Sequence, residues 1–187
     1  MKTAVVTLKS ISPYSQSRYK DMEFPKREKE QPGDHEDRTW RERLHVNEKG
    51  FVFIPPMSFK NCLSEAAKYL AVQIPGKGKT TYTKHFEAGV LVSEPLVLKI
   101  KKEDVIGEWY HVPSDGKRGG GKRVLKCFPC IREWQGDVTF YILDDTVTPE
   151  AFEYHLKQAG QFIGIGRFRP RNNGFYGRFT VEKIKWI

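Results

Sequence analysis

The sequence has little cysteine and no long apolar run. Only three of its 187 residues are cysteines, too few for the disulfide framework that stabilises many small secreted proteins. No apolar run approaches the roughly 20 residues that a membrane-spanning helix needs, and the N-terminus carries no signal-peptide pattern. We therefore expect a cytoplasmic protein of a reducing compartment, without a membrane partner.

Two of the cysteines, Cys127 and Cys130, have the C-x-x-C spacing of many metal and redox sites. A structural zinc site usually needs four ligands, and the sequence has no second close pair. A redox C-x-x-C motif would need a thioredoxin-like βαβ context, which the order of expected elements lacks. We expect both cysteines to pack within a strand, and we expect neither a metal nor a cofactor.

A complete nucleotide-binding loop is also missing. Gly78, Lys79 and Thr80 match the end of the P-loop motif G-x-x-x-x-G-K-[ST]. However, Gln73 stands where the first glycine belongs, and no apolar strand leads into the motif. The sequence thus argues against ATP binding, but a basic loop here could still touch a phosphate backbone.

Positive charge is what the chain has in excess. Lysine and arginine number 32 against 23 aspartates and glutamates, a formal net charge of +9. Such a surplus indicates an anionic partner, of which nucleic acid is the commonest, ahead of an acidic protein or an anionic membrane.

The strongest local signal is the segment 160–179. It holds five glycines and four arginines, has no acidic residue, and intersperses aromatic residues among them. Glycines allow a backbone to approach a ligand closely, arginines present forked donors to phosphate, and aromatic faces stack on bases. The combination favours a nucleic-acid contact. The alternative is a glycine-kinked pair of strands with a solvated basic edge.

Apolar periodicity and helix-capping residues predict six core elements. Ser58 is a candidate N-cap for the first helix. Thr148 followed by Pro149 starts the second helix, and Gly160 would close it. His155 is expected on the solvent side of that helix, and a short helix is possible around 39–44 within an otherwise loop-like stretch at 26–43. In order, we expect a strand at 3–8, a helix at 58–72, strands at 89–100 and 124–143, a helix at 148–159, and an interrupted strand at 161–187.

This order is the β-α-β-β-α-β arrangement of an α+β, ferredoxin-like (RRM-like) fold. A chain of 187 residues suits one such domain, at 1–187, with large insertions at about 10–57 and 72–123. The aromatic signatures of the RNA-recognition module are not evident in the third strand.

A glycine-rich loop between the second helix and the last strand of a ferredoxin-like domain resembles the hallmark of the RAMP superfamily of CRISPR-associated proteins. The matching residues are Gly160, Gly164, Gly166 and Arg167, continuing through Gly174 and Gly177. The insertion at 10–57 and the basic excursion at 100–124 resemble those of crRNA-binding backbone subunits of multi-subunit effector complexes. This resemblance implies a palm domain whose insertions form fingers and a thumb along the guide RNA, with antiviral defence as its setting.

The resemblance also implies the partners: RNA (crRNA), and other copies of the chain or other effector subunits along it. Bound without regard to sequence, such RNA would be held through its phosphates by arginines, lysines and backbone N–H groups. The candidate RNA-binding residues are Gly164, Gly166, Arg167, Arg169, Arg171 and Arg178 in the C-terminal segment, Lys117, Arg118, Lys122 and Arg123 in the excursion, and Lys77, Lys79 and Lys84 in the middle loop.

Two other functions stay open. A processing endoribonuclease of the same superfamily would need a general acid and base. His85, beside Lys84 and Tyr82, is the best candidate, although a loop histidine that only touches phosphate is the simpler reading. Asp34 and Asp37 lie in the first insertion without a motif, so we assign no catalytic residue. The other alternative is a protein-docking module that caps or imitates an effector subunit.

Overall fold

The computed structural model describes residues 1–20, 22–114, 116, 119 and 121–187. Its main sheet has the strand order β3-β7-β1-β8, with every neighbouring pair antiparallel. These strands are β1 (Lys2–Ser10), β3 (Val90–Leu91), β7 (Gln135–Ile142) and β8 (Phe179–Trp186). With helix α2 (Pro56–Leu70) after β1 and helix α4 (Pro149–Gln158) after β7, the order is βαββαβ. The predicted ferredoxin-like α+β fold is confirmed.

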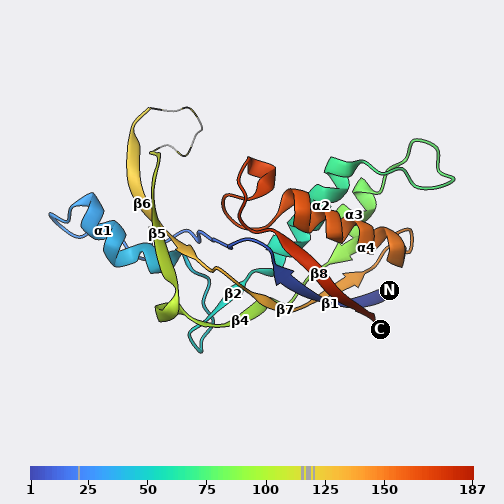
Figure 1. The fold of residues 1–187 in the computed structure, drawn as a ribbon, viewed down its shortest axis with the longest axis horizontal. Helices are drawn as coiled ribbons and strands as arrows, with labels where there is room; N and C mark the ends of the chain where they lie inside the picture. Colours follow the sequence, from blue (N-terminus) through green and yellow to red (C-terminus); the bar gives the residue numbers. More distant parts are fainter. Residues whose placement is uncertain (21, 115, 117–118, 120) are drawn as a thin grey trace.

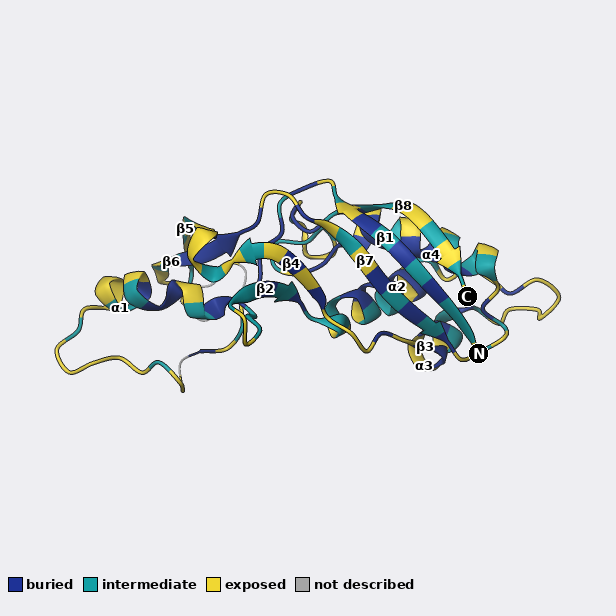
Figure 2. Ribbon diagram, turned by 90° about the horizontal axis from the view of Figure 1, so that it is seen from below, coloured by how far each residue is buried: buried dark blue, intermediate teal, exposed yellow. Residues whose placement is uncertain are grey.

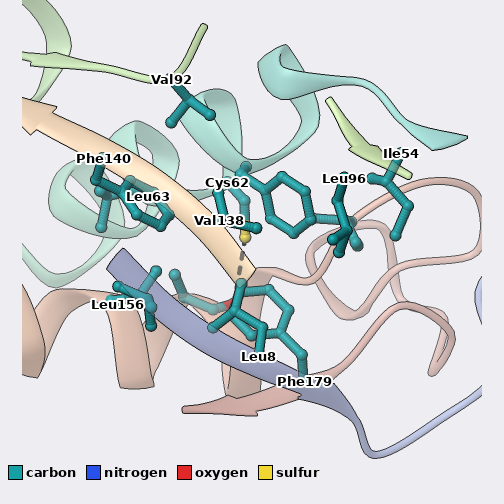
Figure 3. Close-up of a cluster of buried hydrophobic side chains, with 14 of the residues drawn as sticks. Leu8, Ile54, Cys62, Leu63, Val92, Leu96, Val138, Phe140, Leu156 and Phe179 are labelled. Carbon is teal, nitrogen blue, oxygen red and sulfur yellow. Dashed lines mark hydrogen bonds between the residues drawn. The ribbon is translucent and has the colours of Figure 1, made fainter. Parts of the chain in front are cut away.

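The core lies between one face of this sheet and the two helices. Strand side chains alternate between faces, so Ala4, Val6 and Leu8 of β1 are buried while Val5 and Thr7 are partly exposed on the other face. Figure 3 shows Leu8, Val138, Phe140 and Phe179 of the sheet packed with Cys62 and Leu63 of α2 and Leu156 of α4. The Cys62 thiol donates a hydrogen bond to the carbonyl of Ala159 at 3.4 Å.

Two expected strands are each divided in the structure. The expected strand at 89–100 breaks before Pro95: β3 joins the main sheet, whereas β4 (Leu96–Lys101) pairs with β2 (Phe51–Ile54) in a separate two-stranded sheet. Proline lacks the N–H that would continue the ladder. The expected strand at 124–143 likewise divides into β6 (Arg123–Cys130) and β7, because β6 pairs with β5 (Ile106–Pro113) in a long hairpin instead.

The first insertion is more ordered than the sequence indicates. Within 26–43, expected to be mainly loop, the chain forms helix α1 (Pro32–Thr39) and the 3₁₀ turn η1 (Trp40–Arg43). Both pack against β6, so tertiary contacts give order to a segment whose composition is highly charged.

Several predicted boundaries and placements were wrong. Helix α2 begins at Pro56 with Pro55 as its N-cap, so Ser58 lies inside the helix, because proline at the first helical position loses no hydrogen bond. Gly160 does not close the second helix: the chain continues as a π-helical turn η3 (Ala159–Ile163) and turns at Gly164, where φ is +71°. The predicted N-cap is correct, since the Thr148 hydroxyl accepts a hydrogen bond from the Ala151 N–H at 3.2 Å.

His155 lies in the core and not on the solvent side. It is 1% exposed, and its Nδ1 lies 2.7 Å from the Ala151 carbonyl oxygen. The rings of Tyr82 and of Phe86 from helix α3 (Thr83–Gly89) pack against it. Burial lowers its pKa, so this histidine is a neutral core residue.

The molecule is elongated. Figures 1 and 2 place the β5–β6 hairpin and α1 toward one end of the long axis, and the loop 71–82 between α2 and α3 at the other. Within the part of the chain that the structure describes, no helix is long and apolar enough to cross a membrane.

Candidate nucleic-acid interface

The loop 164–178, here called the Gly/Arg loop, is held by backbone hydrogen bonds to the segment that follows β1. The Arg167 N–H donates to the Ser15 carbonyl at 2.8 Å, and the Gly177 N–H donates to the Pro13 carbonyl at 2.7 Å. A Cβ atom at Gly166 would clash with the same Ser15 carbonyl oxygen. Glycine at 166 therefore allows two segments of this chain to touch, and the result is a firmly held loop.

These hydrogen bonds hold Arg167 next to the β5–β6 hairpin. Its guanidinium lies 3.2 Å from the ring centroid of Phe128 on β6 and 4.7 Å from that of Phe168. Burial lowers its pKa from 12.5 to about 10, and the positive charge of Arg43 adds to the effect. The group still carries its charge near neutral pH. No carboxylate of a described residue forms an ion pair with it, so its charge is available to an anion.

Arg43 and Lys126 bring two further cations to the same place. Both contact Glu36 of α1: Arg43 Nη2 lies 2.6 Å from Oε1, and Lys126 Nζ lies 3.2 Å from Oε2. Glu36 is 1% exposed and also accepts a hydrogen bond from the Cys127 N–H at 2.9 Å. One buried carboxylate thus fixes the side of the hairpin that faces the Gly/Arg loop.

Between the hairpin and the Gly/Arg loop lies a groove of about 530 Å³, here called the basic groove. Its charged lining residues are Arg43, Lys126 and Arg167, and Phe128 and Phe168 supply aromatic surface. Among the described residues, the lining contains three cations and no carboxylate, and Glu36, which contacts two of these cations, is itself buried. Such a surface suits a phosphate with an attached ring system.

The other predicted contact residues are scattered. Arg169 and Arg171 form ion pairs with Glu65 of α2 at 3.2 and 3.1 Å, and Arg178 donates to the Gln161 carbonyl at 3.1 Å. Gly164, at the end of the π-helical turn, is buried. These interactions brace the Gly/Arg loop against the helices.

The lysine-rich segments lie apart from one another. Lys122 and Arg123 are exposed at the outer end of the hairpin, whereas Lys117 and Arg118 fall outside the described residues. Lys77 and Lys79 are exposed in the loop 71–82, at the opposite end of the molecule, and Lys84 is exposed on α3. The structure brings Arg167 close to the hairpin but does not bring the middle loop to the same site. The RNA contacts of all these residues stay predictions.

The sequence reasoning missed Arg43, Lys126 and Phe128. For Lys126 and Phe128 a signal existed, since residues two apart on a strand share a face. Arg43 comes from an insertion that looked loop-like, and nothing in the sequence pairs it with the hairpin 84 residues further on.

His85 is braced by a carboxylate. Its Nδ1 lies 2.6 Å from Asp144 Oδ2, and this hydrogen bond lowers the pKa of Asp144. The contact joins α3 to the turn after β7. Asp34 and Asp37 are exposed on α1, on either side of the buried Glu36. Within the described part of the chain, neither forms a hydrogen bond or ion pair with another acid or base.

Both strand cysteines are buried, as the sequence reasoning expects. Burial raises the pKa of Cys127 and of Cys130 to about 11, so both remain protonated thiols near neutral pH. No cluster of three or more His, Cys, Asp or Glu side chains with metal-binding geometry occurs among the residues described.

No protein-family model matches the chain, and no curated protein matches it significantly. Solved structures do resemble it. A chain of "Cryo-EM structure of the Type III-B Cmr-beta bound to cognate target RNA" has a TM-score of 0.54 and 10% identity. That alignment covers 100% of this chain and 60% of the other, so this chain spans about three fifths of that neighbour.

Two further similar structures have lower scores. They are the crystal structure of Cmr6 from Pyrococcus furiosus (TM-score 0.48, 14% identity, covering 97% of this chain and 99% of that one) and a CRISPR RNA-guided surveillance complex (0.37, 10%, 96% and 67%). At these identities the likeness to the Cmr-beta chain is one of fold.

Proposed function

We propose that this protein binds single-stranded RNA as a crRNA-binding, backbone-type subunit of a CRISPR effector. The observation that carries the proposal is Arg167, a cation held by stacking and without a carboxylate partner among the described residues, facing a groove with two further cations. Support comes from the shared fold with a chain of a Cmr-beta structure bound to target RNA. A RAMP-type protein would have the βαββαβ core as its palm, the hairpin as its thumb and the α1 insertion as its fingers.

Phosphates are the part of the RNA that this groove would hold. Forked guanidinium donors suit phosphate oxygens, and contacts of this kind position a strand without reading its sequence. The partners of such a subunit are the crRNA, neighbouring copies of the chain and other effector subunits. The main contacts in this proposal are Arg167, Arg43 and Lys126 in the groove. Gly164, Gly166, Arg169, Arg171, Arg178, Lys122, Arg123, Lys77, Lys79 and Lys84 remain proposed as further, weaker contacts of a longer strand.

The test begins with the protein as purified at low salt. We expect an absorbance ratio at 260 and 280 nm that reveals bound nucleic acid, and a size by light scattering that falls after ribonuclease treatment. A clean monomer that fails to bind single-stranded RNA when RNA is added back would contradict the proposal and favour a protein-docking module.

A further inference from the structure

A second hollow adjoins the basic groove, since Phe168 lines both. It is open and shallow, has a volume of about 230 Å³, and is lined by Tyr110, Phe168, Gly174, Phe175 and Tyr176. We call it the aromatic pocket. Its volume is below the roughly 300–1,000 Å³ of pockets for drug-sized ligands, so it suits a single ring system and not a peptide segment.

Phe168 is common to the two sites, since it contributes to the lining of both. Arg167 lies over it at 4.7 Å, while the rings of Tyr110 and Tyr176 pack at centroid distances of 5.4 and 5.9 Å. Its backbone has a φ of +52°, which is uncommon for a bulky residue. The Tyr176 N–H donates to its carbonyl at 3.0 Å and helps to hold this conformation. Strain of this kind often marks a functional position.

The walls of the aromatic pocket are fixed by hydrogen bonds outside it. Glu108 Oε2 accepts from the Tyr176 hydroxyl at 2.7 Å and also from the Tyr110 hydroxyl, and the two hydroxyls lie 2.9 Å apart. Burial raises the pKa of Tyr176, and the neighbouring hydroxyl and carboxylate add to this, so the phenol stays protonated. The polar ends are satisfied within the protein while the ring surfaces line the pocket, which lowers the cost of ordering a ligand against them.

Phe175 is the most exposed residue of the pocket lining. The residue is 57% exposed, and its ring packs edge-on against that of Tyr176, with the ring centroids 4.7 Å apart. An exposed aromatic residue beside an apolar hollow offers a ring face to a ligand.

We propose that the aromatic pocket takes one nucleobase by stacking while the phosphate of the same strand lies against Arg167 in the basic groove. This inference rests on the proposed RNA-binding function and assigns the base a site of its own. A ligand with an aromatic part and an anionic part fits both hollows at once, which an apolar protein side chain does not. The aromatic lining makes the site tolerant of base identity, because every base has a π-face.

The test compares a six-nucleotide single-stranded RNA with an abasic ribose-phosphate chain of the same length, by fluorescence anisotropy. We expect the wild-type protein to bind the RNA roughly fivefold to over a hundredfold more tightly, the range that one stacked base supplies. Phe175→Ala and Phe175→Leu should both lose most of that preference, since each removes the ring face and Leu keeps the apolar bulk. Both should leave the abasic affinity unchanged.

The matched control is Tyr154→Ala, which removes an aromatic residue that is 47% exposed on α4 and should leave the preference intact. Equal wild-type affinity for the two chains would overturn the base pocket while leaving phosphate binding in place. An unchanged preference for RNA over the abasic chain in both Phe175 variants would also overturn the base pocket. That result would favour an apolar side chain of a partner protein as the occupant of the pocket. Failure to bind either chain would overturn the proposed function together with this inference.

Discussion

Arg167 and Arg171 differ by four positions in the sequence and sit in opposite electrostatic environments. Arg167 lies against Phe128 with the positive charge of Arg43 nearby, whereas Arg171 is 3.1 Å from the carboxylate of Glu65. An arginine already neutralised by a carboxylate gains less from a phosphate, because it must first give up its partner. The composition of the segment does not distinguish the two arginines. Their different electrostatic environments arise only from the fold.

We therefore expect Arg167→Ala to weaken RNA binding roughly tenfold or more, the loss of about 1.5–3 kcal/mol that a charge-assisted hydrogen bond supplies. Arg171→Ala, the matched control in the same loop, should change the affinity by about twofold or less. Anisotropy titrations with one RNA at one salt concentration measure both. Equal losses in the two variants would mean that the segment acts through its total charge and not through the groove.

A second expectation concerns Glu36. Burial raises its pKa, but the hydrogen bonds from Arg43 and the Cys127 N–H outweigh this and leave the pKa below its usual range. A lowered pKa stabilises the fold above the unfolded-state value of about 4.3, and this stability is lost as the pH falls through the folded-state value. Glu36→Gln should lower the free energy of unfolding by about 3–5 kcal/mol at neutral pH, since Arg43 is left without a countercharge.

Urea unfolding at pH 7 and at pH 3 measures this contribution. The wild-type advantage over Glu36→Gln should shrink toward pH 3, because below about 4.3 the unfolded wild-type chain takes up a proton at this carboxylate before the folded protein does. Asp37→Asn provides the control, since Asp37 is exposed on the same helix and should shift the stability by less than about 0.5 kcal/mol. A Glu36→Gln protein as stable as the wild type would show that Glu36 does not stabilise the packing of the hairpin.

At the scale of elements, the junction between α4 and β8 requires a glycine at position 160. The sequence indicates a structural role for Gly160, but the predicted role, ending the helix, was wrong. Gly160 lies within the π-helical turn and not at its end. A Cβ atom there would clash with the carbonyl oxygen and ring of Phe179, the first residue of β8. Glycine at 160 lets the turn lie directly on the last strand.

Gly160→Ala should consequently destabilise the fold by about 1–3 kcal/mol through overpacking. Gly33→Ala is the matched control: its Cβ would meet nothing within 4 Å on α1, so helix propensity predicts a neutral or slightly stabilising change. Thermal or urea unfolding of the two variants tests this. A Gly160→Ala protein as stable as Gly33→Ala would show that the strand can move away from the turn at little cost.

The elements that the sequence predicts well carry strong local signals. Helix α4 has a threonine cap and an early proline, and β1 has β-branched apolar residues in alternation. The β2–β4 pair and α1 could not be predicted, because they depend on contacts between segments far apart in the sequence, such as Phe53 with Val97 and Glu36 with Cys127. The same limit applies to the site: Arg167 was found by composition, and its neighbours Arg43 and Lys126 were not.

For the whole molecule, the fold divides the basic residues between two ends. The basic groove lies at the hairpin side, and Lys77 and Lys79 lie at the far end of the long axis. The net charge of +9 raises the general attraction to a polyanion, so a strand that follows the groove needs no contact with the far loop.

RNA affinity should accordingly fall with rising salt. Arg43 and Lys126 share the carboxylate of Glu36, so the three groove cations leave a net charge of two for the strand. At a slope of about 0.7 for each charge engaged by a single strand, the logarithm of the association constant should fall by about 1.4 per tenfold rise in salt concentration. Arg167→Ala should reduce this slope by about 0.7. A slope near zero would exclude phosphate contacts as the source of binding.

The measurement that tests the account most directly is a map of RNA crosslinks. RNA carrying 4-thiouridine would be bound to the wild-type protein, irradiated, digested, and its crosslinked peptides identified by mass spectrometry. We predict crosslinks within β5, β6 and the Gly/Arg loop, at Tyr110, Phe128, Phe168 or Phe175, lost in Arg167→Ala at matched protein and RNA concentrations. Crosslinks confined to the loop 71–82 or to the open face of the main sheet would contradict the assignment of the basic groove as the RNA site.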